Sequence, residues 1–270
     1  ASAFIYNVDN TGTIGDDEFF FYGRHVGGIV GRLSGEVEKA SNMGDIYNGY
    51  GTVGGIAGWW YKGSIKNAFN TGNITVVNND QENAISQVGG IVGAYGGGDG
   101  VQSELSLAYN LGTIRSFSPY KFKINEQGVA TNEQVRNTIG GIIGRVQNTG
   151  LTIDDVYTTN NLYAATANNV NKYSSNSNGL GAIVGEGGDK ATITDAYYVK
   201  LHDDNNFKDL SNTAGITATI SQENSDATGS YDTNDTNKGN GFVFDNENFQ
   251  SGWRIYTGED GRLGTTPILN

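Results

Sequence analysis

The sequence repeats a two-part unit of glycine and aliphatic residues along most of its length, seen most clearly at residues 54–74. The first part is an apolar residue followed by Gly-Gly-Ile-Val-Gly, with copies at Val26–Gly31, Val53–Gly58, Val88–Gly93, Ile139–Gly144 and, more loosely, Leu180–Gly185. The second part is Ile-x-Asn-Ala-Tyr-Asn-x-Gly-x-Ile, with copies at Ile5–Ile14, Val37–Ile46, Ile65–Ile74, Leu105–Ile114, Ile153–Leu162 and a broken copy from Ile193. Repetition of this kind predicts a stacked architecture in which each copy contacts its neighbours.

Two positions of the second part, three residues apart, are always apolar. The first is aliphatic and the fourth is small, as in Ile65 and Ala68. Residues three apart on a regular strand face opposite sides, so the pattern predicts a bend or bulge near Lys66–Asn67. The fifth position varies from Asp9 to Tyr109, and we expect it to face water.

The sixth and eighth positions indicate fixed contacts and corners. The sixth is Asn10, Asn42, Asn70 and Asn110, which predicts side-chain amide hydrogen bonds passing from layer to layer. The eighth is glycine in four copies and Asn160 in a fifth, a substitution typical of a backbone with positive φ. Gly72→Val should therefore be more destabilising than Gly72→Asn.

The glycine-rich and β-branched segments oppose helix formation, so we expect an all-β fold. The predicted fold is a parallel β-helix, or β-solenoid, of about five to six irregular layers, since one unit alone buries too little apolar surface to fold. The segments 15–26, 47–53, 75–88, 115–139 and 163–180 vary in length and are expected as loop insertions on one side. Residues 1–199 form the repeat array, and residues 200–270 form a polar segment and a C-terminal cap continuous with it.

The Gly-Gly-Ile-Val segments lead to an expectation about the outer surface. Strand alternation places Val26 and Val30 on one face and Ile29 on the other, and both sets are apolar in every copy. One set should then form an outward apolar ladder, covered by the insertions and above all by residues 115–139. Deletion of residues 116–136 is accordingly expected to cause aggregation.

The composition narrows the possible partners. The net charge of −12 and a pI near 4.5 argue against nucleic acid and anionic membranes. The absence of cysteine excludes disulfides and thiolate metal sites. No apolar run approaches the roughly 20 residues of a membrane span. The chain begins with half a repeat and no signal peptide, so we interpret it as a piece of a longer polypeptide whose upstream portion is a partner.

The residues that could carry chemistry are few and dispersed. The histidines, His25 and His202, lie at opposite ends of the array, which argues against a triad or a zinc site. The pairs Asp154–Asp155 and Asp203–Asp204 could serve glycoside cleavage, but Asp155 occupies a structural column of the repeat. Gly96–Gly100 resembles a calcium-binding repeat only faintly and is better interpreted as a flexible turn. We expect no catalytic residues, no metal and no cofactor.

The aromatic run at residues 59–61 is the strongest candidate for binding. The other copies do not require indoles there, and adjacent residues of a strand face opposite sides, so at least one should point outward. Exposed aromatic rings suit stacking on sugars or contact with a protein, unless an insertion folds over them. The candidate binding residues are Trp59, Trp60, Tyr61, Phe117 and Tyr120.

The repeat unit resembles that of a known protein family. The pattern Gly-Gly-Ile-Val-Gly…Ile-x-Asn-Ala-Tyr-Asn-Thr-Gly-x-Ile is similar to the GLUG repeat of filamentous haemagglutinin-like bacterial surface exoproteins, which also occurs beside immunoglobulin A-specific metallopeptidase domains. The resemblance covers about residues 5–199 and, moderately, the ending at Trp253–Gly258 and Thr266–Leu269. It implies a right-handed parallel β-helix, secreted and displayed as a stalk or adhesin without catalytic residues.

The sequence is therefore predicted to be a non-enzymatic structural or adhesive segment of a bacterial fibre, located outside the cell or at its surface. Its partner would be an unidentified glycan or protein receptor on a host or another cell. Two alternatives stay open: a subunit of a self-assembling extracellular filament, and a carbohydrate-active β-helix enzyme, a lyase or a hydrolase. No nucleic acid binding and no membrane insertion are expected.

Overall fold

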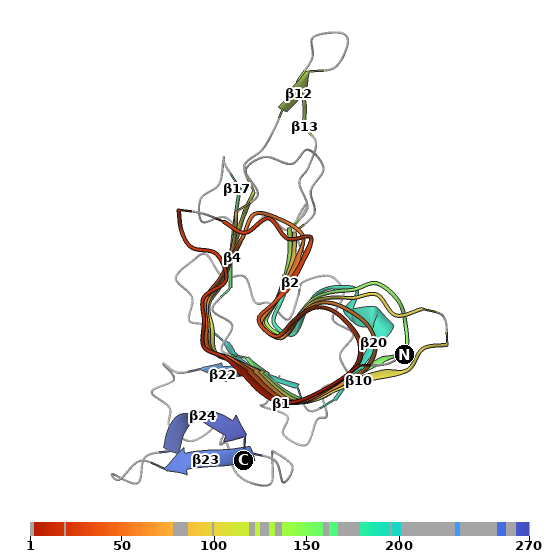
Figure 1. The fold of residues 1–270 in the computed structure, drawn as a ribbon, viewed down its shortest axis with the longest axis vertical. Helices are drawn as coiled ribbons and strands as arrows, with labels where there is room; N and C mark the ends of the chain where they lie inside the picture. The colour runs from red at the N-terminus through yellow and green to blue at the C-terminus, as the bar shows by residue number, and fades with distance from the viewer. Residues whose placement is uncertain are drawn as a thin grey trace.

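The structure is a computed structural model that describes residues 3–18, 20–77, 86–98, 100–118, 122–124, 130–132, 137–158, 162–166, 179–194, 196–200, 230–232, 253–257 and 263–269. Within these residues it is all-β, with one short 3-10 turn, η1, at Gly188–Lys190. Three parallel sheets run along one stack and account for most strands. The fold is thus the predicted parallel β-solenoid (Figure 1).

The three sheets form the walls of the stack. Sheet A holds β1 Ala3–Asn10, β3 Val30–Asn42, β6 Ala57–Asn70, β9 Val92–Tyr95, β10 Ser103–Asn110, β15 Ile143–Val146, β16 Leu151–Thr158, β19 Val184–Glu186, β20 Ala191–Ile193, β21 Ala196–Lys200 and β22 Ser230–Asp232. Sheet B holds β4 Ile46–Asn48, β7 Ile74–Val77, β11 Ile114–Ser118 and β17 Leu162–Thr166. Sheet C holds β2 His25–Gly27, β5 Thr52–Gly54, β8 Ser86–Gly89, β14 Asn137–Gly140 and β18 Gly179–Gly181.

Each turn of the chain passes from sheet A to sheet B, then to sheet C and back to sheet A (Figure 1). The order β1, β3, β6, β10, β16 and β21 in sheet A marks six successive layers, in agreement with the predicted number. Two antiparallel hairpins stand apart from the walls: β12 Phe122–Ile124 with β13 Ala130–Asn132, and β23 Trp253–Thr257 with β24 Leu263–Leu269. The hairpin of β12 and β13 lies in the connection between sheet B and sheet C, where the insertions were expected.

The repeat columns set the register between layers. Ile5 pairs with Val37, Val37 with Ile65, and Ile65 with Leu105, and from the second layer on these aliphatic side chains are fully buried. The small residues three positions later are also inside, as Ala68 and Ala108 show with 0% exposure. Both can face inward because the chain bends between them at a residue with positive φ. That residue is Asn7, Lys39, Asn67, Leu107 or Asp155, with φ of 49–57°. The predicted bend is confirmed.

The asparagine ladder is also confirmed. The side-chain amide of Asn42 donates to Oδ1 of Asn70 at 2.7 Å, and Asn70 donates in the same way to Asn110 at 2.7 Å. These three amides are fully buried. The second glycine of each Gly-Gly pair lies directly against the ladder, since a Cβ on Gly55 would stand 2.5 Å from Cγ of Asn70. The ladder and the glycines thus separate two apolar clusters, one inside the curl of sheet A and one between sheets B and C.

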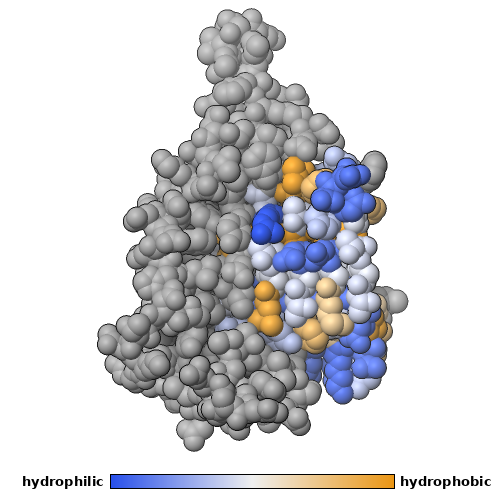
Figure 2. Space-filling model, turned by 90° about the vertical axis from the view of Figure 1, so that its left-hand side faces the viewer, coloured by the Kyte–Doolittle hydropathy of each residue, from blue (hydrophilic) through white to orange (hydrophobic). Residues whose placement is uncertain are grey.

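The expected outward apolar ladder is wrong. Ile56 and Ala57 both have 0% exposure and belong to the same cluster, whereas Val53 belongs to the other. The reason is that the chain turns at Gly-Gly-Ile instead of continuing as a strand, so strand alternation does not apply there. The face carrying β4 shows apolar residues only as separate patches among polar ones in its described part (Figure 2). There is therefore no longer a structural reason to expect aggregation after deletion of residues 116–136.

The positive φ predicted for Gly72 is also wrong. Gly72 is not among the residues with positive φ in the described part of the chain. Instead, a Cβ at Gly72 would stand 2.1 Å from the carbonyl oxygen of Gly44 in the preceding layer. The same close approach recurs between Gly112 and Gly72 at 2.0 Å. The glycine column is required by contact between layers, which excludes asparagine as well as valine; Asn160 lies outside the described residues.

The fifth column of the repeat is buried in three of the five layers in which its side chain is described, contrary to expectation, whereas Asp9 is exposed and Phe69 is half-buried. Ser41, Tyr109 and Tyr157 have exposures of 1%, 5% and 1%. In-register pairing brings Phe69 and Tyr109 into a stack with ring centroids 5.0 Å apart and an angle of 3° between planes. The Phe69 ring thus covers one face of Tyr109, and burial raises the pKa of Tyr109 to about 12. The boundary between residues 199 and 200 and the predicted C-terminal cap stay predictions, since most of residues 200–270 lie outside the described residues.

Candidate functional site

The three aromatic residues at the start of β6 have different environments. Trp60 has 0% exposure and packs edge-on against Tyr95, with ring centroids 5.2 Å apart. It occupies a column with Leu33, Tyr95 and Val146, all of them core residues. Trp60 is therefore part of the core, and this apolar column was the sequence signal that could have shown it.

Trp59 and Tyr61 face outward but are partly covered. The Trp59 ring is half-buried and lies 5.4 Å from the His25 ring. A Cβ on Gly96 would meet the Trp59 indole at 2.1 Å, and one on Gly98 would stand 2.9 Å from the Tyr61 hydroxyl. Gly96 and Gly98 thus pack closely against these two rings, and the N–H of Val101 donates to the carbonyl of Gly98, as in a turn. The flexibility predicted for the turn at Gly96–Gly100 stays a prediction, since Asp99 lies outside the described residues. Tyr61 keeps 39% exposure, because it is the extra residue of a bulge between β6 and β3.

The remaining candidate residues contribute little to a site. Phe117 lies in β11, paired with Val77 and Ala165, and its side chain is outside the described part. Tyr120, Asp203, Asp204 and His202 lie outside the described residues. Asp155 is buried at one of the positive-φ positions, as its structural role requires, while Asp154 accepts a hydrogen bond from Thr194. The structure therefore brings no two of these carboxylates or histidines together within its described part.

His25 is half-buried. Its Nδ1 lies 2.7 Å from the Thr52 hydroxyl, and its pKa is lowered by burial and by the nearby Arg24 and Arg32. The lowered pKa favours the neutral imidazole, whose ring packs against Trp59. Among the described residues, no group of three or more histidine, cysteine, aspartate or glutamate side chains is placed to hold a metal ion. No helix in the described part is long and apolar enough to cross a membrane.

The feature that sequence reasoning missed is a groove on the outer face of sheet A. It has a volume of about 390 Å³ and is lined by Glu36, Gly63, Ser64, Gln102, Ser103, Glu104 and Thr152. Four of these residues are register partners in consecutive layers: Glu36, Ser64, Glu104 and Thr152. They alternate with the buried aliphatic column, so their side chains point away from the core. We call this feature the outer groove.

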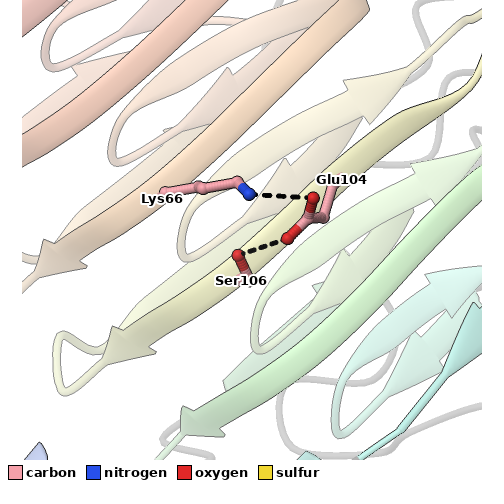
Figure 3. Close-up of polar contacts among 3 residues, drawn as sticks. All are labelled: Lys66, Glu104 and Ser106. Atoms are coloured by element: carbon pink, nitrogen blue, oxygen red, sulfur yellow. Dashed lines mark hydrogen bonds and ion pairs between the residues drawn. The ribbon is translucent and has the colours of Figure 1, made fainter. Parts of the chain in front are cut away.

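The carboxylate of Glu104 is held in place at this groove. Lys66 Nζ lies 2.9 Å from Glu104 Oε2, and the Ser106 hydroxyl donates to Glu104 Oε1 at 2.9 Å (Figure 3). The hydrogen bond from Lys66 lowers the pKa of Glu104, and the one from Ser106 lowers it further. Lys66 and Ser106 are register partners, so Lys66 reaches diagonally across the layers to Glu104. The pair fixes a negative charge at a defined place on the outer face.

An aromatic patch lies further along the same face. Phe4 and Tyr6 on β1 are exposed by 62% and 49%, and their rings stack with centroids 6.0 Å apart. Lys39 Nζ donates to the Tyr6 hydroxyl at 3.0 Å and lies 5.2 Å from the Tyr6 ring centroid. Phe4 is the register partner of Glu36, so the aromatic patch adjoins the outer groove.

Comparison with known proteins adds no assignment, since no family model, no curated protein and no solved structure matches the chain. The resemblance to the GLUG repeat rests on the repeat residues, and the structure supports its coarser consequence, an all-β stack of parallel strands.

Proposed function

We propose that this chain is a non-enzymatic adhesive module of a secreted or surface-displayed bacterial fibre, and that the outer groove and its aromatic patch bind a glycan. The observation that carries the proposal is the row of in-register polar side chains, Glu36, Ser64, Glu104 and Thr152, which ends at Phe4, whose ring stacks on Tyr6. The GLUG resemblance supports the extracellular location and the role in a fibre.

The chemistry of this face suits a sugar chain. Hydroxyl and carboxylate groups are hydrogen-bond partners for sugar hydroxyls, and exposed aromatic rings offer apolar faces for stacking. Layers about 4.8 Å apart place such groups at regular intervals along the groove. The polar residues of the groove stand on strands that pair on both sides, so little ordering of these residues is required on binding. A protein receptor is the second form of the same proposal.

The carbohydrate-active alternative is less well supported by the groove. Glu36 and Glu104 stand two layers apart, about 9.6 Å by strand spacing, near the upper limit for the carboxylate pair of an inverting glycosidase. However, the general acid of such a pair requires a raised pKa, whereas the pKa of Glu104 is lowered by Lys66 and Ser106. That environment keeps Glu104 ionised, which favours a role in binding and disfavours a role as a proton donor.

The test is binding of the purified chain to an immobilised panel of glycans. Glu36→Gln and Glu104→Gln should each reduce the signal at least about fivefold, since each removes a charged hydrogen-bond acceptor. Asp17→Asn removes an exposed carboxylate elsewhere and serves as the matched control. Absence of binding to every glycan, or equal binding by groove and control variants, would refute the glycan proposal. Adhesion to cells that survives enzymatic removal of their glycans would assign recognition to a protein receptor.

A further inference from the structure

Sheets C and A meet at an angle where each turn of the chain passes through its Gly-Gly-Ile segment (Figure 1). The two sheets touch at the vertex of this angle, since a Cβ on Gly58 would stand 2.4 Å from the backbone nitrogen of Val26. The next residues outward on the two sheets, His25 and Trp59, are therefore brought together, with ring centroids 5.4 Å apart. The Thr52 hydroxyl lies 2.7 Å from Nδ1 of the same imidazole. The indole is thus held in place beside a half-buried histidine.

Two arginines flank this pair of rings. Arg32 is the register partner of Trp59 on the neighbouring strand β3, and Arg24 directly precedes His25. Both guanidinium groups are close enough to the imidazole to lower its pKa. Both arginines are exposed, and within the described part of the chain neither guanidinium makes an ion pair or a hydrogen bond. With the exposed Tyr61 of β6, these residues form what we call the arginine–tryptophan patch: Arg24, His25, Arg32, Trp59 and Tyr61.

The positive charge of this patch contrasts with the rest of the chain. The net charge is −12, so carboxylates are abundant, yet Arg24 and Arg32 lie around the same imidazole without one as a partner. Like charges held close without a counter-charge repel each other, and an anionic group bound between them relieves that repulsion. The patch therefore favours an anionic ligand.

The same charges limit how large that anion can be. A polyanion such as nucleic acid requires many phosphate contacts and is repelled by the acidic remainder of the chain. Two guanidinium groups suit a single carboxylate, because each presents its N–H donors in a planar fork that matches the two carboxylate oxygens. The outer groove does not suit such a ligand, since Glu36 and Glu104 lie there. Along β3 the outer face thus changes from basic at Arg32 to acidic at Glu36.

The rings beside the arginines indicate which kind of carboxylate fits. His25 and Gly96 cover part of the Trp59 indole, which stays half-buried, and the ring of Tyr61 is 39% exposed. Both rings offer flat apolar surface next to the positive charge. A sugar ring has an apolar face that packs on such a surface, together with hydroxyls that can bond the phenol of Tyr61. The side chain of an acidic peptide has a carboxylate but no flat ring.

We propose that the arginine–tryptophan patch is a second sugar site, which binds a glycan residue carrying one carboxylate, a sialic or a uronic acid. Arg24 and Arg32 hold the carboxylate, and Trp59 and Tyr61 pack against the sugar ring. The site goes beyond the outer groove, which binds by different residues and carries the opposite charge. The inference shares with the proposed function only the class of ligand.

The test uses two matched pairs of soluble sugars with the intact chain. Sialyllactose and lactose differ by one acidic sugar, and galacturonate and its methyl ester differ in the charge of one carboxyl group. Saturation-transfer nuclear magnetic resonance gives the dissociation constant of each sugar. We expect the acidic member of at least one pair to bind at least about tenfold more tightly than its neutral partner. The pair that responds identifies the source as a sialic or a uronic acid.

Arginine variants locate the binding. Arg24→Gln and Arg32→Gln should each weaken binding of the acidic sugar at least about fivefold, because each removes a charged hydrogen-bond donor. Arg115→Gln is the matched control, since it makes the same change in net charge at an exposed position of β11 in sheet B. All three arginines are exposed, so the urea unfolding midpoint should stay the same and exclude misfolding as the cause.

Glu104→Gln separates this inference from the proposed function. A loss of neutral glycan binding in this variant, with acidic sugar binding retained, supports two separate sites. If the outer groove binds no glycan at all, acidic sugars should still bind at the patch. Equal binding of the acidic and neutral members in both pairs would overturn the inference. Equal binding by Arg32→Gln and Arg115→Gln would overturn it as well, and so would acidic sugar binding that depends on Glu104 instead of Arg32.

Discussion

Replacement of Asn70 by alanine tests how much the buried amide ladder contributes to stability. The Asn70 side chain accepts from Asn42 at 2.7 Å and donates to Asn110 at 2.7 Å and to the Gly72 carbonyl at 2.8 Å. Three hydrogen bonds at roughly 1 kcal/mol each contribute about 3 kcal/mol. The truncation also leaves a small cavity beside Gly55, so we expect a loss of about 3–5 kcal/mol in the free energy of unfolding.

Asn10→Ala is the matched control at the open end of the same ladder. Asn10 also makes three hydrogen bonds, to Asn42 Oδ1 and to the carbonyl and N–H of Gly12. Because Asn10 is only half-buried, water can replace the lost partners, and we expect a loss of about 1 kcal/mol. Asn70→Thr should fall between the two, since Thr158 occupies the equivalent position with 0% exposure.

The measurement is urea unfolding, followed by circular dichroism and by tryptophan fluorescence. Repeat arrays can lose layers independently, so the two probes must give the same midpoint before a free energy is derived. The expected difference between Asn70→Ala and Asn10→Ala is about 2 kcal/mol or more. Similar losses for the two variants would show that burial does not strengthen the ladder and would refute the reasoning.

Three further predictions concern packing between layers and the ionisable groups. Gly72→Ala places a Cβ 2.1 Å from the Gly44 carbonyl oxygen and should cost at least about 2 kcal/mol by thermal unfolding, whereas Gly12→Ala should be near neutral. Lys66→Met should raise the pKa of Glu104, as measured by nuclear magnetic resonance titration. Because folding lowers this pKa, the stabilisation that the Glu104 carboxylate provides is fully present above the ordinary pKa of 4.5 and is lost as the pH falls through the lowered pKa. Folding raises the pKa of Tyr109 from 10.0 to about 12, so stability should fall over that range as the unfolded chain ionises first, and Tyr109→Phe should reduce this fall.

The fold could be predicted because the repeat columns determine the register between strands of neighbouring layers. A layer that repeats Ile65, Ala68 and Asn70 at fixed spacing must place like residues over one another, whatever the length of the connections. The turns of the chain in the asparagine ladder take 32, 28 and 40 residues, yet the ladder positions coincide. The bend at Asn67 followed from the same columns, since two inward residues three apart require it.

Other features could not be derived because the sequence pattern has two structural solutions. A Gly-Gly-Ile-Val segment is compatible with a strand or with a turn, and only the packing of Gly55 against Asn70 decides for the turn. The role of Gly72 was misjudged for a similar reason, since positive φ and close approach both select glycine. The bulge at Tyr61 shifts the register by one residue, which strand alternation could not anticipate.

The candidate site was missed because it depends on contacts between layers. Lys66 and Glu104 are far apart in sequence, and their contact requires the register together with a diagonal reach across two strands. Outward positions vary from layer to layer, so no column pattern marks them as a set. The aromatic run at 59–61 attracted attention because indoles are rare, yet the invariant apolar character of its column already placed Trp60 in the core.

The two sides of each strand in sheet A are under different physical constraints. Inward positions must be complementary to the same position one layer away, because the glycine, asparagine and aliphatic columns pack without free space. Outward positions meet solvent, so a change from serine to glutamate, as from Ser64 to Glu104, alters surface chemistry at little cost in stability. Variation along the outer groove can therefore specify a ligand while the inward columns preserve the stack. Glu36→Gln should accordingly change binding without changing the unfolding midpoint, and Glu104→Gln, which also removes the exposed ion pair with Lys66, should lower the midpoint only slightly. A loss of binding with so small a change in stability separates a binding defect from misfolding in the glycan experiment.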